Sequence, residues 1–151
     1  MLDIKGLSYQ IGGNQILREL DLHIAEQQYY ALAGENGAGK STLIKIILDL
    51  IRNIESGSVK IAGVDRRQTP ARKRLSYLPE KFDVKREVSG WQYLHFVAGV
   101  YRKILNQSRV EQLCEQLSLD VQKLELKASV YSKGMKQKLG LISCFMLDNP
   151  L

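Results

Sequence analysis

Residues 34–42 read Gly34-Glu35-Asn36-Gly37-Ala38-Gly39-Lys40-Ser41-Thr42 and fit the pattern G-x-x-x-x-G-K-S/T at every fixed position. A loop of this kind surrounds a phosphate with backbone N–H groups, and the helix behind it favours negative charge. Lys40 would then reach the β- and γ-phosphates of a nucleotide, and the Ser41 hydroxyl would be a ligand of Mg²⁺. The alternative is a chance match, which this composition gives with a probability of roughly one in a hundred.

The segments on either side of this loop support the nucleotide interpretation. Residues 29–33 are a mostly apolar run with the length of a buried strand, and residues 43–48 continue as a helix-like segment. We therefore predict a phosphate-binding loop at a strand-to-helix turn.

Composition places the chain among globular proteins. It has 151 residues, of which 44% are hydrophobic and 25% charged. No apolar run approaches the roughly 20 residues of a membrane span, and the amino terminus lacks the layout of a secretory signal. We expect a cytoplasmic chain in which Cys114 and Cys144 are reduced packing residues. His23 and His95 have no partners at catalytic spacing and are expected to be structural or exposed.

The net charge of +6 gathers in three basic clusters: Arg66-Arg67, Arg72-Lys73-Arg74 and residues 81–86. Such clusters bind nucleic acid, contact an anionic membrane or form a solvated surface. No aromatic residues interleave with them, as a nucleic-acid platform requires. A solvated surface is therefore favoured, and nucleic acid is not.

Strand-like patterns occur at residues 2–11, 16–24, 58–62 and 75–78. The first two are separated by Gly12-Gly13-Asn14, which predicts an antiparallel pair, and the third follows a glycine turn at residues 55–57. Pro79 ends the fourth. Residues 70–74 could form one helical turn.

Helical spacing begins at Ser89. One face is expected to carry Trp91, Leu94, Val97, Val100 and Tyr101. Residues 108–111 fit a capping box, which predicts a second helix with an apolar stripe at Val110, Leu113, Cys114 and Leu117.

Residues 131–135 read Tyr131-Ser132-Lys133-Gly134-Met135 and precede a third helix. Ser132 is its predicted N-cap, and its apolar positions are Met135, Leu139, Ile142, Cys144 and Met146. A hydroxyl and a glycine N–H at a helix N-terminus form a second anion site, and the alternative is a capped helix without a ligand.

The loop at 34–42, the turn at 55–57 and the turn at 131–135 together resemble the nucleotide-binding subunit of an ATP-binding cassette (ABC) transporter, over essentially the whole chain. Residues 131–135 stand where this family has Leu-Ser-Gly-Gly-Gln. With the Lys-Gln-Lys-Leu-Gly that follows, they are similar to the exporter branch whose membrane partner is a type-2 ABC permease.

The resemblance implies an α/β P-loop NTPase of ABC type, with an antiparallel β subdomain, a partial parallel core sheet and a helical subdomain. Residues 1–88 would form the core with the nucleotide loop (Walker A), residues 89–128 the helical subdomain, and residues 129–151 the signature turn and its helix. The chain would be truncated before the Walker B motif, and so lack the aspartate and glutamate that support Mg²⁺ and hydrolysis. We accordingly expect poor ATP binding and hardly any turnover from this chain alone.

The family mechanism pairs two subunits head to tail. ATP and Mg²⁺ held by residues 34–42 of one subunit would be closed over by residues of the other: Ser132, Lys133, Gly134 and Met135. A permease would receive the binding energy through the groove between the sheet core and the helices from Ser89 to Leu117, which places the subunit on the inner face of the cell membrane. A soluble ABC ATPase acting on nucleic acid or ribosomes, and a non-hydrolysing remnant, are the alternatives.

Two positions depart from the family pattern. The glutamine that reaches Mg²⁺ and the attacking water aligns with Glu80, so a carboxylate would serve as a metal ligand at this catalytic position. The aromatic residue that stacks on adenine aligns with Ile11, and Tyr9 is the next candidate.

Overall fold

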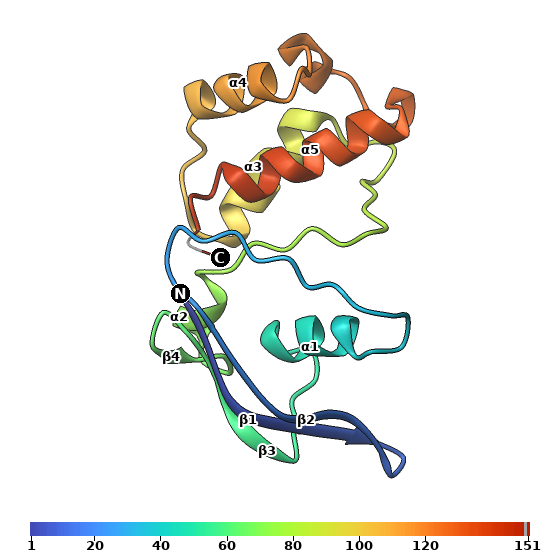
Figure 1. The fold of residues 1–151 in the computed structure, drawn as a ribbon. Coiled ribbons are helices and arrows are strands. Elements are labelled where there is room, and N and C mark those ends of the chain that lie inside the picture. The colour runs from blue at the N-terminus through green and yellow to red at the C-terminus, as the bar shows by residue number, and fades with distance from the viewer. Residues whose placement is uncertain (150) are drawn as a thin grey trace. The chain divides into compact units, whose positions relative to one another are not determined.

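The structure, a computed structural model, describes residues 1–149 and residue 151. These residues form two compact units, each with its own hydrophobic core (Figure 1). Unit 1 comprises residues 1–75 and Leu151, and unit 2 comprises residues 76–149.

Unit 1 is built on a four-stranded antiparallel sheet of order β2-β1-β3-β4. Its strands are β1 (Leu2–Ile11), β2 (Asn14–Ile24), β3 (Ser56–Ile61) and β4 (Val64–Asp65). The predicted pair of strands and the third strand are thereby confirmed. Gly57 lets β3 pass close to β1, because a Cβ there would lie 2.5 Å from the carbonyl oxygen of Gly6.

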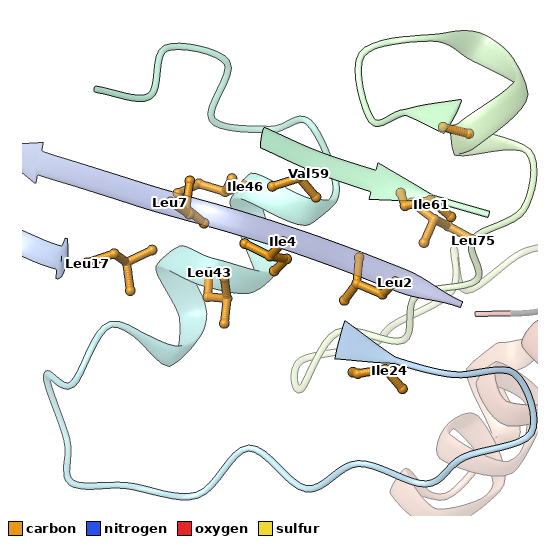
Figure 2. Close-up of a cluster of buried hydrophobic side chains, with 11 residues drawn as sticks. Leu2, Ile4, Leu7, Leu17, Ile24, Leu43, Ile46, Val59, Ile61 and Leu75 are labelled. Carbon is orange, nitrogen blue, oxygen red and sulfur yellow. The ribbon is translucent and has the colours of Figure 1, made fainter. Parts of the chain in front are cut away.

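One helix, α1 (Lys40–Ile47), covers one face of this sheet. Its buried side chains, Leu43 and Ile46, belong to one cluster with Ile4 and Leu7 of β1 (Figure 2). A Leu side chain buried in this way stabilises a fold by about 1.5–3 kcal/mol. The short helix α2 (Thr69–Arg72) corresponds to the predicted helical turn.

The predicted strands at 29–33 and 75–78 are wrong, because the structure gives neither segment a strand. A strand exists only where a neighbour takes up its N–H and C=O groups. Among the described residues, every strand belongs to the antiparallel sheet, and all five residues of 29–33 are exposed. The described residues therefore contain no parallel strand pair, which the family resemblance had implied.

Unit 2 consists of helices α3 (Gly90–Val100), α4 (Gln107–Gln116) and α5 (Lys133–Phe145), with the 3₁₀ helices η1 (Val121–Glu125) and η2 (Ala128–Val130). They surround a core that includes Leu94, Val110, Leu113, Leu124, Leu139 and Ile142. In the described residues, no helix combines the length and apolarity that crossing a membrane requires.

Two details of the helix predictions are corrected. The N-cap of α4 is Asn106, whose side chain accepts a hydrogen bond from the Arg109 N–H, and not Ser108. Only part of the predicted α3 face is buried: Leu94 is buried, whereas Val100 is exposed. The predicted α4 stripe is confirmed at Val110, Leu113 and Cys114.

Candidate functional site

The loop at residues 34–42 leads directly into the first turn of α1. Gly39 is the residue before the helix and has left-handed backbone angles, with φ 83°. No side chain caps this helix end, and its first turn contains no acidic residue. Because the first N–H groups of a helix lack intrahelical partners, those of α1 are available to an anion.

Lys40 folds back over the loop. Its Nζ donates to the carbonyl oxygens of Gly34 and Glu35, at 2.6 Å each. The loop is also closed by a hydrogen bond from Ala38 N–H to the Glu35 carbonyl. The Lys40 ammonium group therefore lies over the loop that leads into α1, close in sequence to the free N–H groups of the first helical turn.

Gly39 fixes the loop against strand β2. An ideal Cβ on Gly39 would lie 3.1 Å from both the Ile16 carbonyl oxygen and Leu17 Cδ2, and 3.2 Å from Ile16 Cγ2. A bulge in the sheet explains this double contact: Tyr9 pairs with Leu17 and Gln10 with Gln15, which leaves Ile16 as the extra residue. Any other residue at position 39 would adopt a strained positive φ and would press its Cβ closely against β2.

The other end of α1 is held by Arg66, although its place in a basic cluster predicts a solvated surface. Arg66 is instead buried. Its guanidinium donates to the carbonyl oxygens of Ile46, Ile51 and Arg52 and to the Asp49 carboxylate, at 2.7–3.1 Å. Burial lowers the pKa of the Arg66 guanidinium, and the charge of Asp49 opposes this effect. The sequence around Arg66 does not indicate that its side chain fixes the end of α1.

The turn at residues 131–135 has the predicted cap. The Ser132 Oγ accepts a hydrogen bond of 3.2 Å from the Met135 N–H, and Ser132, Lys133 and Gly134 are exposed. Tyr131 anchors the turn, because its buried ring places the hydroxyl where it donates to the Lys123 carbonyl at 2.6 Å. The polar edge of this turn is therefore rigidly held and open to a partner.

The segment containing Glu80 is attached to the first turns of α5. Gln137 Nε2 donates to the Glu80 carbonyl at 3.3 Å, and Lys136 Nζ lies 2.7 Å from Asp83 Oδ1. The hydrogen bond from Lys136 lowers the pKa of the Asp83 carboxyl, and a second one from the Val84 N–H adds to this. Within unit 2 the structure thus brings the Glu80 segment next to the helix that begins at the 131–135 turn.

The two predicted metal ligands belong to different units, Ser41 to unit 1 and Glu80 to unit 2, and both are exposed. Within the described ranges, no group of three or more His, Cys, Asp or Glu side chains could hold a metal. The exposed Ser41 hydroxyl fits a Mg²⁺ that takes its remaining ligands from phosphate and water, as this ion usually does.

The two candidate base contacts differ in exposure. Tyr9 is partly buried and packs against the core of unit 1, whereas Ile11 at the hairpin end of β1 is 52% exposed. Only Ile11 presents a substantial free surface.

Unit 2 also has a groove of about 630 Å³ between residues 83–88 and α3. It is lined by Asp83, Val84, Lys85, Val88, Gln92, Tyr93 and Phe96. Most of its lining is apolar, and Phe96 is 68% exposed.

Comparison with known proteins gives consistent matches. The sequence model described as "ABC transporter" matches residues 17–151. An ABC transporter ATP-binding protein of Bacillus subtilis, YdbJ, is 32% identical over 97% of this chain and 47% of its own length. The bacitracin transport ATP-binding protein BcrA of Enterococcus faecalis is 28% identical, covering all of this chain and 51% of its own. The methionine import ATP-binding protein MetN of Clostridium acetobutylicum is also 28% identical, over 98% and 48%.

A solved structure of the ATP binding subunit of an ABC transporter superposes with a TM-score of 0.86 and 29% identity. The matched region covers 99% of this chain and 63% of the chain in that structure. The chain thus spans about half the length of the three relatives it matches.

Proposed function

The chain belongs to the ABC transporter family, and we propose that it is the part of a transporter's ATP-binding subunit that holds the triphosphate. The observation that carries this proposal is the loop at 34–42. It combines an uncapped helix start, the left-handed Gly39 and the Lys40 ammonium group on one turn of backbone.

In this proposal the N–H groups at the start of α1 and Lys40 bind the β- and γ-phosphates, and Ser41 offers its hydroxyl to Mg²⁺. The metal neutralises phosphate charge when bound. Hydrolysis, in which the γ-phosphoryl group passes to water and ADP is released, needs a residue that positions the water. We propose that Glu80 lies near the attacking water, because it aligns with the glutamine that reaches this water in the family.

We further propose that two copies pair head to tail. Ser132, Lys133, Gly134 and Met135 of one copy would then close over the triphosphate bound by the other. Support comes from the exposure of Ser132 and Gly134 at a rigid helix start, since a Cβ on Gly134 would meet only Ser132 Oγ, at 3.9 Å. That surface leaves room for a phosphate to approach the backbone.

The groove beside α3 is the proposed contact for the permease, which would hold the subunit on the cytoplasmic face of the membrane. Its apolar lining, with the exposed Phe96, suits an amphipathic segment of a membrane protein. Export is the proposed direction, because the turn at 131–135 resembles that of the exporter branch.

Replacement of Lys40 tests the central claim. Hydrogen bonds from a charged donor contribute about 1.5–3 kcal/mol, so Lys40→Ala in the full-length protein should weaken ATP binding roughly tenfold to 150-fold. Titration calorimetry with Mg²⁺ and ATP measures the dissociation constant. Lys45→Ala is the matched control, because Lys45 is an exposed lysine in the last turn of the same helix. Equal affinity of the two variants would contradict the proposal.

A further inference from the structure

We propose that Arg52, Arg67 and Arg72 of unit 1 form a binding site for a terminal phosphate group, separate from the loop at 34–42. The ligand is a small phosphate compound or the headgroup of a lipid, which share this chemistry. The site lies in the segment after α1 and around α2, where Arg66 and Asp49 already form a buried ion pair. The inference does not depend on the proposed function.

The guanidinium groups of four arginines converge on one buried carboxylate and one carbonyl oxygen. The Asp49 carboxylate is 5% exposed and lies 3.1 Å from Arg66 Nη1 and 3.3 Å from Arg72 Nη1. Arg52 Nε is 3.8 Å from the same carboxylate. The Arg52 carbonyl oxygen accepts hydrogen bonds from both Arg66, at 2.9 Å, and Arg67, at 3.0 Å. Arg72 also donates to the Arg67 carbonyl, so these side chains are fixed relative to one another before a ligand binds.

Positive charge exceeds negative charge in this network. Four guanidinium groups face two carboxylates, those of Asp49 and Asp65, and the Asp65 carboxylate accepts a hydrogen bond from the Arg67 N–H at 2.8 Å. Burial lowers the pKa of the Arg66 guanidinium most, the charge of Asp49 opposes this effect, and the charge of Arg67 lowers the pKa further. The guanidinium groups therefore repel one another, and a bound anion would reduce that repulsion.

Arg52 and Arg67 also have donors that no protein group occupies. Each guanidinium group offers several N–H donors. Among the described residues, the Arg67 side chain donates one hydrogen bond, and the Arg52 side chain makes only the 3.8 Å contact with Asp49. Both side chains are exposed, that of Arg52 to 78%, and the Arg72 side chain is 41% exposed. Planar guanidinium groups bind phosphate oxygens through paired hydrogen bonds, so these side chains together suit a phosphate group.

The composition of the site favours a terminal phosphate over a nucleic acid strand or a carboxylate. Residues 49–53 and 65–74 contain no aromatic residue, whereas single-stranded nucleic acid binds by stacking its bases on aromatic rings. A carboxylate would bring a single negative charge. A phosphate monoester brings a charge of about −1.5 to −2 at pH 7 and three acceptor oxygens, which matches the excess charge and the exposed arginines.

Titration calorimetry of the full-length Lys40→Ala protein with inorganic pyrophosphate tests this site, because the variant weakens the phosphate loop as a competitor. Arg67→Gln in this background should weaken pyrophosphate binding about tenfold or more, because it removes charged donors. Arg52→Gln should do the same, and both replacements leave the Arg52 carbonyl in place. Arg74→Gln is the matched control: it makes the same change of charge two residues after Arg72, and no hydrogen bond of the described chain involves the exposed Arg74 side chain. It should weaken binding by less than about twofold.

Co-sedimentation with phosphatidylcholine vesicles that contain phosphatidic acid distinguishes the two sources of the phosphate. Vesicles with phosphatidylglycerol are the control, because this anionic lipid has no terminal phosphate. Binding to phosphatidic acid vesicles that Arg67→Gln abolishes would assign the site to a lipid headgroup. Pyrophosphate binding without vesicle binding would assign it to a small phosphate compound.

The outcomes also separate this inference from the proposed function. Wild-type protein should bind one more equivalent of pyrophosphate than Lys40→Ala, at the phosphate loop. If Lys40→Ala loses all binding, the inference is wrong and the proposed function stands. If Arg67→Gln loses one equivalent and Lys40→Ala loses none, the inference stands and the phosphate loop proposal is wrong. Equal affinities of Arg67→Gln and Arg74→Gln, or equal binding to both kinds of vesicle without pyrophosphate binding, would overturn the inference.

Discussion

Replacement of Arg66 by methionine should destabilise unit 1, although Arg66 lies far along the chain from the phosphate loop. The side chain is 2% exposed and donates four hydrogen bonds, three of them to carbonyl oxygens near the end of α1. Methionine fills much of the volume but donates nothing. The carbonyls of Ile46, Ile51 and Arg52 would each lose a charged donor.

The expected loss can be bounded from these contacts. A buried acceptor left without its partner costs about 1–3 kcal/mol, and removal of one member of a buried ion pair costs about 3–5 kcal/mol. Asp49 would not be stranded, because Arg72 lies 3.3 Å and Arg52 3.8 Å from its carboxylate. The carbonyls of Ile46 and Arg52 also keep other donors, the Asp49 N–H and the Arg67 guanidinium. We therefore expect a decrease of about 1–3 kcal/mol in the free energy of unfolding, mainly from the Ile51 carbonyl.

Urea unfolding followed by far-ultraviolet circular dichroism gives the overall loss, and hydrogen exchange of residues 40–52 locates it. Trp91, the only tryptophan, belongs to unit 2, so its fluorescence reports on the other unit. Arg74→Met is the matched control, because Arg74 is exposed and should change stability by less than about 0.5 kcal/mol. A loss below about 1 kcal/mol in Arg66→Met, or unchanged exchange at residues 40–52, would refute the proposed role.

Two further variants test the proposed assembly. Ser132→Ala should leave ATP binding to a single copy intact and abolish ATP-driven pairing of the full-length protein, measured by sedimentation velocity. Asn106→Ala is the control: it removes another helix N-cap, at a similar cost in stability of about 1 kcal/mol, and this variant should pair normally. Phe96→Asp should abolish co-purification of the permease, because it places a charge in the apolar groove. Ile104→Asp, outside the groove, is the control and should retain the permease. Equal recovery of the permease with both variants would exclude the groove as its contact surface.

Local patterns predicted much of the fold. Alternating apolar residues predicted β1 and β2, and the nucleotide-loop pattern predicted the start of α1. Ser132 was predicted as an N-cap from its place before a helical pattern, and its hydrogen bond with Met135 confirms it. The similarity to a solved ABC subunit confirms the predicted fold class. The roles assigned to individual site residues remain proposals.

The strand error and the Arg66 error share a physical cause, which is dependence on distant parts of the chain, whereas the α4 cap error is local. Residues 29–33 have the composition of a strand, but pairing requires a neighbour that these patterns do not specify. Ser108 and Glu111 fit the capping-box pattern, yet α4 begins two residues earlier, at the cap Asn106. Arg66 resembles its exposed neighbour Arg67 in sequence, and only the folded chain shows that the end of α1 surrounds it.

Unit 1 therefore fixes the phosphate loop unequally on its two sides. Gly39 lies against the bulged strand β2, and Arg66 ties down the far end of α1, so the helical side is set before a ligand arrives. Residues 29–33 on the other side are exposed and take no part in the described sheet. Ordering a backbone residue costs about 1–2 kcal/mol. Any ligand or strand that fixes this side must offset that cost, and the affinity of unit 1 for a triphosphate should rise once residues 29–33 are paired.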